Sequence, residues 1–216
     1  MPDFTHLLID LDDTIYASNL EIWNRVQERI FEFMRAKIDV PESEMLPLRE
    51  RLYETYGTTL RGLQIEYNVD QQEYLAYVHD CLLDDLLFPN PELADMLARY
   101  PQERWIYTNA SRQHAERVLN RLGVGHLFKG IIDVVDTNPY CKPQLESLEI
   151  MLKLVGSPDP TRCVFVDDRA SNLDTAAAVG ILPVQVSSTP HPTYATIARI
   201  EDLPRAFPPN GSRPSA

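Results

Sequence analysis

The sequence has few cysteines, and their spacing is typical of neither a metal site nor a disulfide framework. Cys81, Cys141 and Cys163 are the only three in 216 residues, and no CxxC pair or cysteine and histidine cluster surrounds them. Zinc sites and disulfide frameworks need such spacings. We therefore expect three reduced thiols, as in a cytoplasmic protein.

Positive charge is also scarce. The chain has 20 Lys and Arg against 32 Asp and Glu, a formal net charge of −12, and no basic run relieves it. This balance repels a nucleic-acid backbone, so no nucleic-acid partner is expected. A small anionic substrate would instead need a bound metal ion or a few well-placed cations.

Long apolar runs are missing as well. The opening MPDFTHLLID has no basic segment before its short apolar stretch, and no later run approaches the roughly 20 residues of a membrane-spanning helix. We expect no membrane partner and a cytoplasmic location. The 44% of hydrophobic residues is enough for a sizeable core.

Five short apolar stretches predict buried parallel strands, because they are bounded by turn signals and alternate with helical patterns. Such alternation is typical of an α/β protein with a doubly wound parallel sheet. The predicted strands are 6–10, 104–108, 130–135, 162–167 and 181–186.

Three helices are predicted between these strands. The first ends at Gly123, the second has Pro143 at its first position, and the third opens with a capping box of Ser171 and Asp174. The apolar positions that give the first two their helical spacing are Ala115, Val118, Leu119, Leu122, Leu145, Leu148, Leu152 and Val155.

Residues 16–88 break the alternation, because helical patterns follow one another there without strands. We predict a helical insert, or cap, at 16–88 and a catalytic core made of 1–15 and 89–205. The end of the chain, 206–216, includes PPNGSRPSA, which lacks apolar residues to pack, and is predicted to be disordered. The first cap helix is predicted from Leu20, Trp23, Val26, Ile30 and Phe33.

Acidic residues follow two of the predicted strands. Asp10, Asp12 and Asp13 come directly after the first, and Asp167 and Asp168 end another. Any one of them alone could be a turn or cap residue. Ligands of an open α/β sheet bind at the carboxyl ends of its strands, so the two clusters are expected to meet there. Carboxylates together suit Mg²⁺, which prefers oxygen ligands.

Three polar residues follow other strands and favour phosphate binding. Thr108 and Asn109 offer a hydroxyl and backbone N–H groups before a helix, although an ordinary helix cap would use the same residues. Lys142 stands at the predicted start of a helix, where a cation gains nothing from the helix dipole. It is either held for an anionic partner or is a solvated surface lysine.

The order of these motifs resembles the haloacid dehalogenase superfamily. DLDDT at 10–14, Thr108, Lys142 and VDD at 166–168 follow one another on alternating strands and helices over nearly the whole chain. The resemblance implies a Rossmann-like core with a cap domain. It also implies phosphatase chemistry, with Asp10 as a covalent nucleophile and Asp12 as acid and base.

The same resemblance implies the other roles. Mg²⁺ would be held by Asp10, the backbone carbonyl of Asp12 and Asp168, with Asp167 helping directly or through water. Residues two apart in an extended segment point to the same side, which would let Asp10 and Asp12 address one phosphoryl group. Thr108 and Lys142 would hold the phosphoryl oxygens, with Asn109 beside them.

The cap is similar to that of pyrimidine 5′-nucleotidases. The stretch YETYGTTLRGL at 53–63 carries their YG…RGL pattern. Arg61 could donate to a base carbonyl and Tyr56 could stack on a ring, or both could merely shape the cap. The resemblance makes UMP or CMP the leading substrate, a small phosphorylated metabolite.

Other functions stay open. A broad phosphatase for sugar phosphates or phosphoglycolate, or a phosphomutase, would share every core residue. Other nucleotides, such as nicotinamide mononucleotide, are also compatible. A binding module that has lost turnover is disfavoured, because Asp10, Asp12, Thr108, Lys142 and Asp168 are all present. The oligomeric state is not indicated by the sequence.

Overall fold

The computed structural model describes residues 4–16, 21–81, 83 and 85–209, and the chain divides into two units. One unit consists of Met1–Asn19 and Leu87–Ala216, and the other of Leu20–Leu86. The first contains the sheet, whereas the described residues of the second form helices. We call them the core and the cap. No described helix has both the length and the apolar character needed to cross a membrane.

The core contains a six-stranded sheet in the order β3-β2-β1-β4-β5-β6, and every neighbouring pair is parallel. This arrangement confirms the predicted α/β fold. The order reverses beside β1, so the fold has a switch point between β1 and β4. The strands are β1 His6–Ile9, β2 Glu103–Tyr107, β3 Gly130–Ile132, β4 Cys163–Asp167, β5 Leu182–Val186 and β6 Ala195–Ile197.

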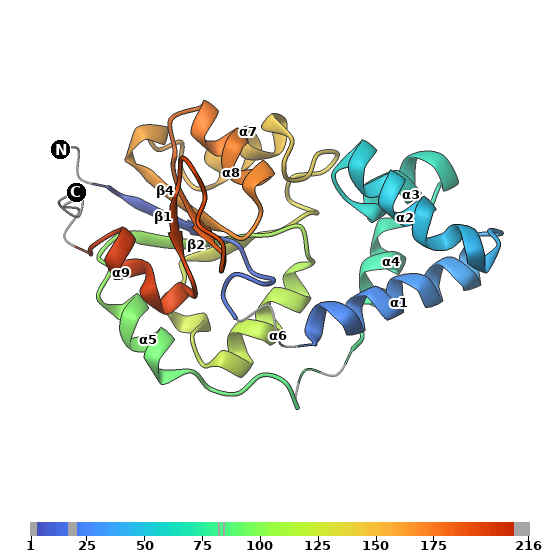
Figure 1. Ribbon diagram of the computed structural model, residues 1–216, viewed down its shortest axis with the longest axis horizontal. Helices are drawn as coiled ribbons and strands as arrows, with labels where there is room; N and C mark the ends of the chain where they lie inside the picture. Colours follow the sequence, from blue (N-terminus) through green and yellow to red (C-terminus); the bar gives the residue numbers. More distant parts are fainter. Residues whose placement is uncertain (1–3, 17–20, 82, 84, 210–216) are drawn as a thin grey trace. The chain divides into compact units, whose positions relative to one another are not determined.

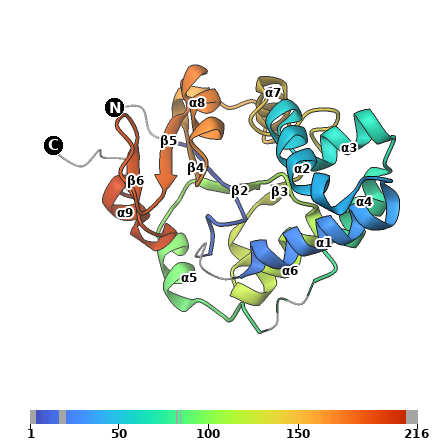
Figure 2. The same cartoon turned by 45° about the vertical axis from the view of Figure 1, so that its right-hand side comes forward.

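Helices cover both faces of this sheet. Figures 1 and 2 show α7 and α8 on one side of the strands and α5 and α6 on the other. Sheets of this type are buried on both faces, which explains why Leu7, Leu8 and Ile9 of β1 have no exposed surface. The core helices are α5 Pro91–Ala98, α6 Arg112–Leu122, α7 Leu145–Leu154, α8 Ala170–Ala178 and α9 Leu203–Ala206, with short 3₁₀ helices at Gly125–Leu127, Pro160–Arg162 and Ile200–Asp202.

Several predicted boundaries in the core are corrected by the structure. The second helix begins at Leu145, and Pro143 lies in the turn before it. Ser171 does not cap α8, because that helix starts at Ala170 with Arg169 as its N-cap. The predicted strand 130–135 ends at Ile132, since Asp133 accepts hydrogen bonds from the backbone N–H groups of residues 135 and 136 and turns the chain.

The predicted disordered end and the strand count also need correction. Phe207 is buried and its carbonyl accepts a hydrogen bond from the Tyr100 hydroxyl at 2.5 Å, so the packed chain extends past 206. Residues 210–216 of that prediction lie outside the described part. The strand β6 was not predicted, because its three residues lie at the sheet edge and contain one buried side chain.

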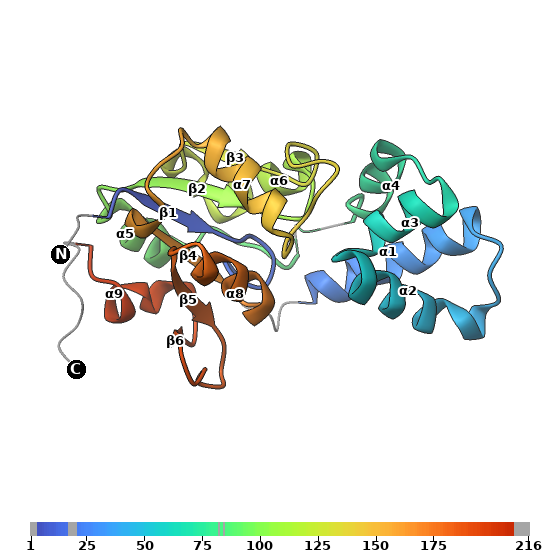
Figure 3. The ribbon, with the colours of Figure 1, turned by 90° about the horizontal axis from the view of Figure 1, so that it is seen from above.

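The cap consists of α1 Ile22–Lys37, α2 Glu42–Tyr56, α3 Thr59–Tyr67 and α4 Gln71–Val78, which Figure 3 shows together. The predicted long helix corresponds to α1, whose buried stripe includes Val26, Ile30 and Phe33; Leu20 lies outside the described residues. Between α2 and α3, Gly57 has a φ of 87°, a conformation in which a Cβ is strained. This tight turn lets α3 fold back onto α2.

Candidate active site

The site forms at the carboxyl ends of β1 and β4. Ile9 pairs with Val166, and the Asp10 N–H continues this pairing by donating to the Val166 carbonyl at 2.9 Å. The next residue on each strand is therefore an aspartate, Asp10 beside Asp167. Carboxylate oxygens of Asp10, Asp167 and Asp168 lie within 4.8 Å of one another. Two acidic motifs more than 150 residues apart thus meet at one point.

Lys142 joins these carboxylates. Its Nζ donates to Asp10 Oδ1 at 2.6 Å, to Asp167 Oδ2 at 2.8 Å and to the Tyr107 carbonyl at 3.0 Å. An ammonium group has three protons, and these three acceptors match them. Lys142 is only 4% exposed, which excludes the alternative of a solvated surface lysine.

The backbone of Lys142 is fixed by Asn109. The Asn109 side chain accepts from the Lys142 N–H at 2.9 Å and donates to the Lys142 carbonyl at 3.0 Å. These bonds use the side-chain amide of Asn109, and phosphate binding through its backbone N–H stays a prediction. Asn109 positions the lysine that neighbours both aspartates.

Asp167 is fully buried and is held by the loop and helix that follow it. Asn172 Nδ2 donates to its two oxygens at 3.0 and 2.9 Å, and the Arg169 N–H donates to Oδ1 at 2.8 Å. Together with Lys142, these donors occupy both carboxylate oxygens. Asp167 therefore serves as the rigid support of Lys142.

Negative charge exceeds positive charge at the centre of the site. Burial raises the pKa of Asp168 to about 6, and the charge of Asp167 adds to this effect. Burial also raises the pKa of Asp10, against the attraction of Lys142. Burial alone would lower the pKa of Lys142, but the negative charges of Asp10 and Asp167 outweigh this effect, so its pKa is raised. Three carboxylates face one ammonium group, and their donor atoms are all oxygen. This set fits a hard divalent cation.

The chain turns sharply after Asp10. Residues 12–15 form a turn in which the Ile15 N–H donates to the Leu11 carbonyl at 3.0 Å, and Asp13 has a φ of 59°. Asp12 thus begins a turn, so the alternation of an extended segment does not explain its position. Burial, with the charge of Asp12, raises the pKa of Asp13 to about 6.

The Asp12 carboxylate contacts two side chains that sequence reasoning missed. Its Oδ1 accepts from the Tyr16 hydroxyl at 2.6 Å and lies 2.9 Å from His114 Nε2. His114 is 1% exposed and lies on the apolar stripe of α6, beside Ala115 and Val118. A histidine within an apolar stripe was the available signal, because a buried imidazole needs a polar partner.

Thr108 follows β2 and completes the described site. It is buried, and its Oγ1 accepts from the Ala110 N–H at 2.9 Å. Its own N–H donates to the Ile132 carbonyl, which continues the pairing of β2 with β3. The hydroxyl proton of Thr108 is not used in the bond to Ala110, so the group can still donate to an anion.

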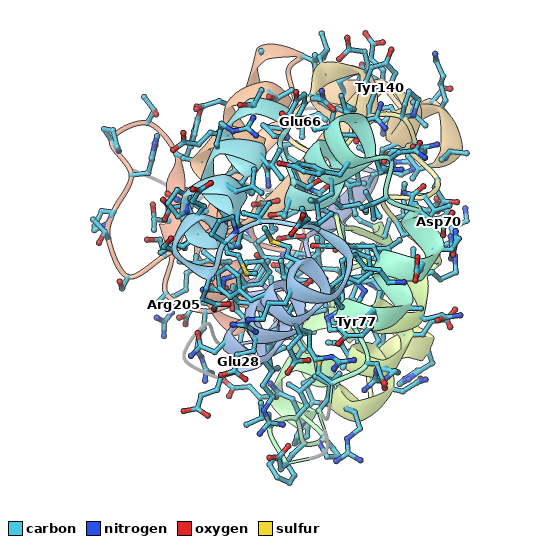
Figure 4. All side chains as sticks on the ribbon, turned by 90° about the vertical axis from the view of Figure 1, so that its right-hand side faces the viewer. Glu28, Glu66, Asp70, Tyr77, Tyr140 and Arg205 are labelled. Atoms are coloured by element: carbon cyan, nitrogen blue, oxygen red, sulfur yellow. The ribbon has the colours of Figure 1, made fainter. Side chains whose placement is uncertain are left out.

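Tyr56 and Arg61 lie in the cap. The Tyr56 hydroxyl donates at 3.0 Å to Glu66, a residue of α3 labelled in Figure 4 that also pairs with Arg51. Arg61 Nη1 lies 3.4 Å from Gln64 Oε1, and the Arg61 N–H is capped by Thr58. The Tyr56 hydroxyl therefore has a contact within the cap, and the roles of Tyr56 and Arg61 toward a substrate stay predictions.

The family is decided by a match over most of the chain. A family model described as haloacid dehalogenase-like hydrolase matches residues 4–180. The chain belongs to this family. The match begins before β1 and ends after α8, so it includes every residue of the site described above. As a haloacid dehalogenase-like hydrolase, the chain is identified as a hydrolase, in agreement with the sequence resemblance.

Individual relatives agree with the family. The chain is 26% identical over 186 residues to phosphate metabolism protein 8 of Saccharomyces cerevisiae. The matched region covers 80% of this chain and 58% of the yeast protein. The chain thus spans less than two thirds of this curated relative.

Solved structures with a similar fold include the following two. The hydrolase YfnB of Bacillus subtilis, bound to magnesium, has a TM-score of 0.62, 18% identity and coverage of 94% and 98%. A L-2-haloacid dehalogenase of Xanthobacter autotrophicus with covalently bound chloropropionic acid has a TM-score of 0.56, 18% identity and coverage of 94% and 97%.

Proposed function

We propose that this chain is a magnesium-dependent phosphomonoester hydrolase whose substrate is a pyrimidine nucleoside monophosphate. The observation that carries the proposal is the cluster of Asp10, Asp168 and buried Lys142, with a second carboxylate at Asp12. A phosphoryl group is an anion that needs a nucleophile, positive charge and a proton donor for its leaving group. This cluster supplies all three when a cation is bound.

Asp10 is the nucleophile in this proposal. Its carboxylate oxygen forms a bond to phosphorus as the bond from phosphorus to the leaving oxygen breaks, and Asp12 gives its proton to that oxygen. Water then forms a bond to phosphorus as the bond from the Asp10 oxygen to phosphorus breaks, and Asp12 takes a proton from that water. Inorganic phosphate leaves, and both carboxylates return to their initial state.

The other residues hold the phosphoryl group and the nucleophile. Lys142, fixed by Asn109 and Asp167, keeps Asp10 in place and supplies positive charge near its reacting oxygen. The Thr108 hydroxyl donates to a phosphoryl oxygen. Because these groups are buried and held before substrate arrives, little reorganisation is needed in the transition state.

Magnesium would be held by Asp10, Asp168 and the backbone carbonyl of Asp12, with Asp167 acting through water. When bound, it neutralises charge on the phosphoryl oxygens and on the carboxylates. The excess of carboxylates over ammonium groups supports this assignment. The magnesium bound to the structurally similar YfnB is consistent with it.

Three considerations favour a phosphatase over a dehalogenase, although dehalogenases share the fold. A leaving halide needs no proton, so a dehalogenase has no use for the acid at Asp12. Metal neutralisation of the substrate is not required there either. The name of the yeast relative, which refers to phosphate metabolism, points the same way.

The substrate class is proposed from the cap. Arg61 donates to a carbonyl of the pyrimidine base, and Tyr56 presents its ring to the base. The runner-up is a sugar phosphate or phosphoglycolate phosphatase, or a phosphomutase, because the core residues are the same and the cap alone separates the substrates.

The deciding experiment measures phosphate release with Mg²⁺ from UMP, CMP, AMP, GMP, nicotinamide mononucleotide, phosphoglycolate and glucose phosphates. A clear preference for UMP and CMP is expected. Asp10→Asn should lose at least about 10³-fold in kcat, because the nucleophile is removed. Asp39→Asn makes the same change at an exposed cap position and should retain full activity. Full activity of Asp10→Asn, or of protein freed of metal, would refute the mechanism.

Arg61→Ala tests the substrate class separately. It should raise KM for UMP about tenfold or more while sparing 4-nitrophenyl phosphate, which has no base to contact. Arg35→Ala, an exposed arginine of the same unit, is the matched control. Equal losses on both substrates would assign Arg61 to the structure of the cap, and a sugar phosphate at the top of the panel would discard the nucleotide.

A further inference from the structure

Two buried donors converge on one oxygen of Asp12. Tyr16 Oη lies 2.6 Å and His114 Nε2 2.9 Å from Oδ1, and the two side chains are 6% and 1% exposed. One donor is four residues away in sequence and the other is 102 residues away. We propose that His114 and Tyr16 are positioning residues that hold Asp12 for proton transfer, an inference that rests on the proposed phosphatase function.

The direction of both hydrogen bonds follows from the chemistry of a carboxylate. Oδ1 accepts when the carboxyl group is ionised and when its proton is on Oδ2, so in both forms His114 bears a proton on Nε2 and the Tyr16 hydroxyl donates. With Oδ1 accepting from both, the catalytic proton is carried by Oδ2. In the first step the Oδ2–H bond breaks and an O–H bond forms on the leaving oxygen; in the second, Oδ2 takes a proton from water.

The donors themselves are rigid. His114 lies in the first turn of α6, a helix capped by Ser111, and its neighbours Ala115 and Val118 have no exposed surface. Tyr16 directly follows Ile15, which is also completely buried. By contrast, the Asp12 side chain is 27% exposed and stands in a turn. Without these donors it would sample other rotamers, and a misplacement of about 1 Å can reduce a rate by roughly 100-fold.

Leaving-group dependence provides the test. Loss of proton donation slows departure of an alkoxide, such as the 5′-oxygen of a nucleotide, far more than departure of 4-nitrophenolate, which leaves without a proton. The Asp12→Asn variant gives the benchmark for this difference. The quantity compared is kcat/KM, because it reports the step in which Asp10 displaces the leaving group.

We expect His114→Ala and Tyr16→Phe to lose roughly 10- to 100-fold in kcat/KM on the best nucleotide and no more than about threefold on 4-nitrophenyl phosphate. His114→Gln keeps an N–H donor near the position of Nε2 and should recover most of the loss. In the Asp12→Asn background, His114→Ala should add nothing, because there is no proton to position.

The outcomes separate the two proposals. Equal losses on both substrates, or no loss on either, overturn the positioning role while leaving the phosphatase intact. A wild-type protein that releases phosphate from no phosphomonoester overturns the function itself. If His114→Ala does not fold, Tyr16→Phe decides the question, since it removes a single hydroxyl group.

Discussion

The core and the cap both contain short ion pairs, but in opposite surroundings. In the core, Lys142 lies 2.6 Å from Asp10, and the two side chains are 4% and 9% exposed. In the cap, Arg35 lies 2.6 Å from Glu42, and these side chains are 48% and 66% exposed. Removing one partner of a buried pair leaves the other charge buried and unpaired, which costs stability. Removing one partner of an exposed pair leaves the other charge hydrated by solvent, which costs little. Burial, and not distance, decides what each pair contributes.

The carboxyl groups of the two units show the same contrast. Burial raises the pKa of Asp168 in the core, whereas the hydrogen bond from Arg35 lowers the pKa of Glu42 in the cap. A raised pKa means that the folded site opposes the negative charge. The core therefore holds its charges at some loss of stability, as expected of a site kept for a cation and an anionic substrate.

Lys142→Met should give the largest effect. It leaves Asp10 and Asp167 buried without their shared ammonium group, and we expect a loss of about 3–5 kcal/mol in the free energy of unfolding, measured in urea without Mg²⁺. Lys129→Met is the matched control: Lys129 pairs with Glu103 at 2.5 Å, but both are about half exposed. Its loss should stay within about 1 kcal/mol. Similar losses for the two variants would contradict the role given to burial.

Gly62→Ala should be next, and it tests the packing of the cap. A Cβ at Gly62 would lie 2.6 Å from Leu52 Cδ2 and 2.7 Å from Leu52 Cβ, so α2 and α3 would have to separate. We expect a loss of up to about 3 kcal/mol, although alanine is the better helix former. Ile65→Ala on the exposed side of α3 should change stability by less than about 0.5 kcal/mol. A Gly62→Ala protein more stable than wild type would show that the Leu52 side chain can move to accommodate the added methyl group at little cost.

The effect of Asp168→Asn on stability should be opposite in the absence and in the presence of Mg²⁺. The pKa of Asp168 is raised from 3.8 to about 6, so its contribution to stability is present below pH 4 and is lost as the pH rises through 6. At pH 7 in EDTA the variant should be more stable than wild type, on the order of 1–2 kcal/mol. This gain should fade toward pH 4. With Mg²⁺ the order should reverse, because the metal stabilises only the protein that binds it.

Thermal unfolding at both pH values, with and without Mg²⁺, checks this prediction. If Mg²⁺ stabilises wild type and variant equally, Asp168 does not bind the metal. A variant that is less stable in EDTA at pH 7 would show instead that Asp168 forms a stabilising contact in the absence of metal.

Much of the core site could be predicted from the sequence, because its residues follow strands. The carboxyl ends of parallel strands share one edge, so Asp10 and Asp167 could be brought together without knowing the strand order. Their contact with Lys142 could not, since it depends on the turn that precedes α7. The helix start at Pro143 was wrong because Lys142 and Pro143 form a turn, which the Gln144 N–H closes by donating to the Cys141 carbonyl at 2.8 Å.

Contacts of Asp12 illustrate the limit of sequence reasoning more clearly. His114 and Asp12 are 102 residues apart, and only the packing of α6 brings the imidazole to the turn after β1. In the cap, YG…RGL could be recognised, but the reason for its second glycine could not. Gly62 is required by the close approach of Leu52, a residue that precedes the motif.

Arg35→Ala should have the smallest effect. The pair with Glu42 is exposed, and the lowered pKa of Glu42 means that its contribution is present at neutral pH and is lost as the pH falls below its ordinary value of 4.5. Any destabilisation should be seen only near pH 7 in low salt. At 1 M salt the screening length is about 3 Å, and the difference should vanish. A double-mutant cycle with Glu42→Ala isolates the pair from changes in helix propensity. A coupling that persists in 1 M salt would show that an exposed pair can act like the buried one, and the contrast between core and cap would then lie in packing and not in burial of charge.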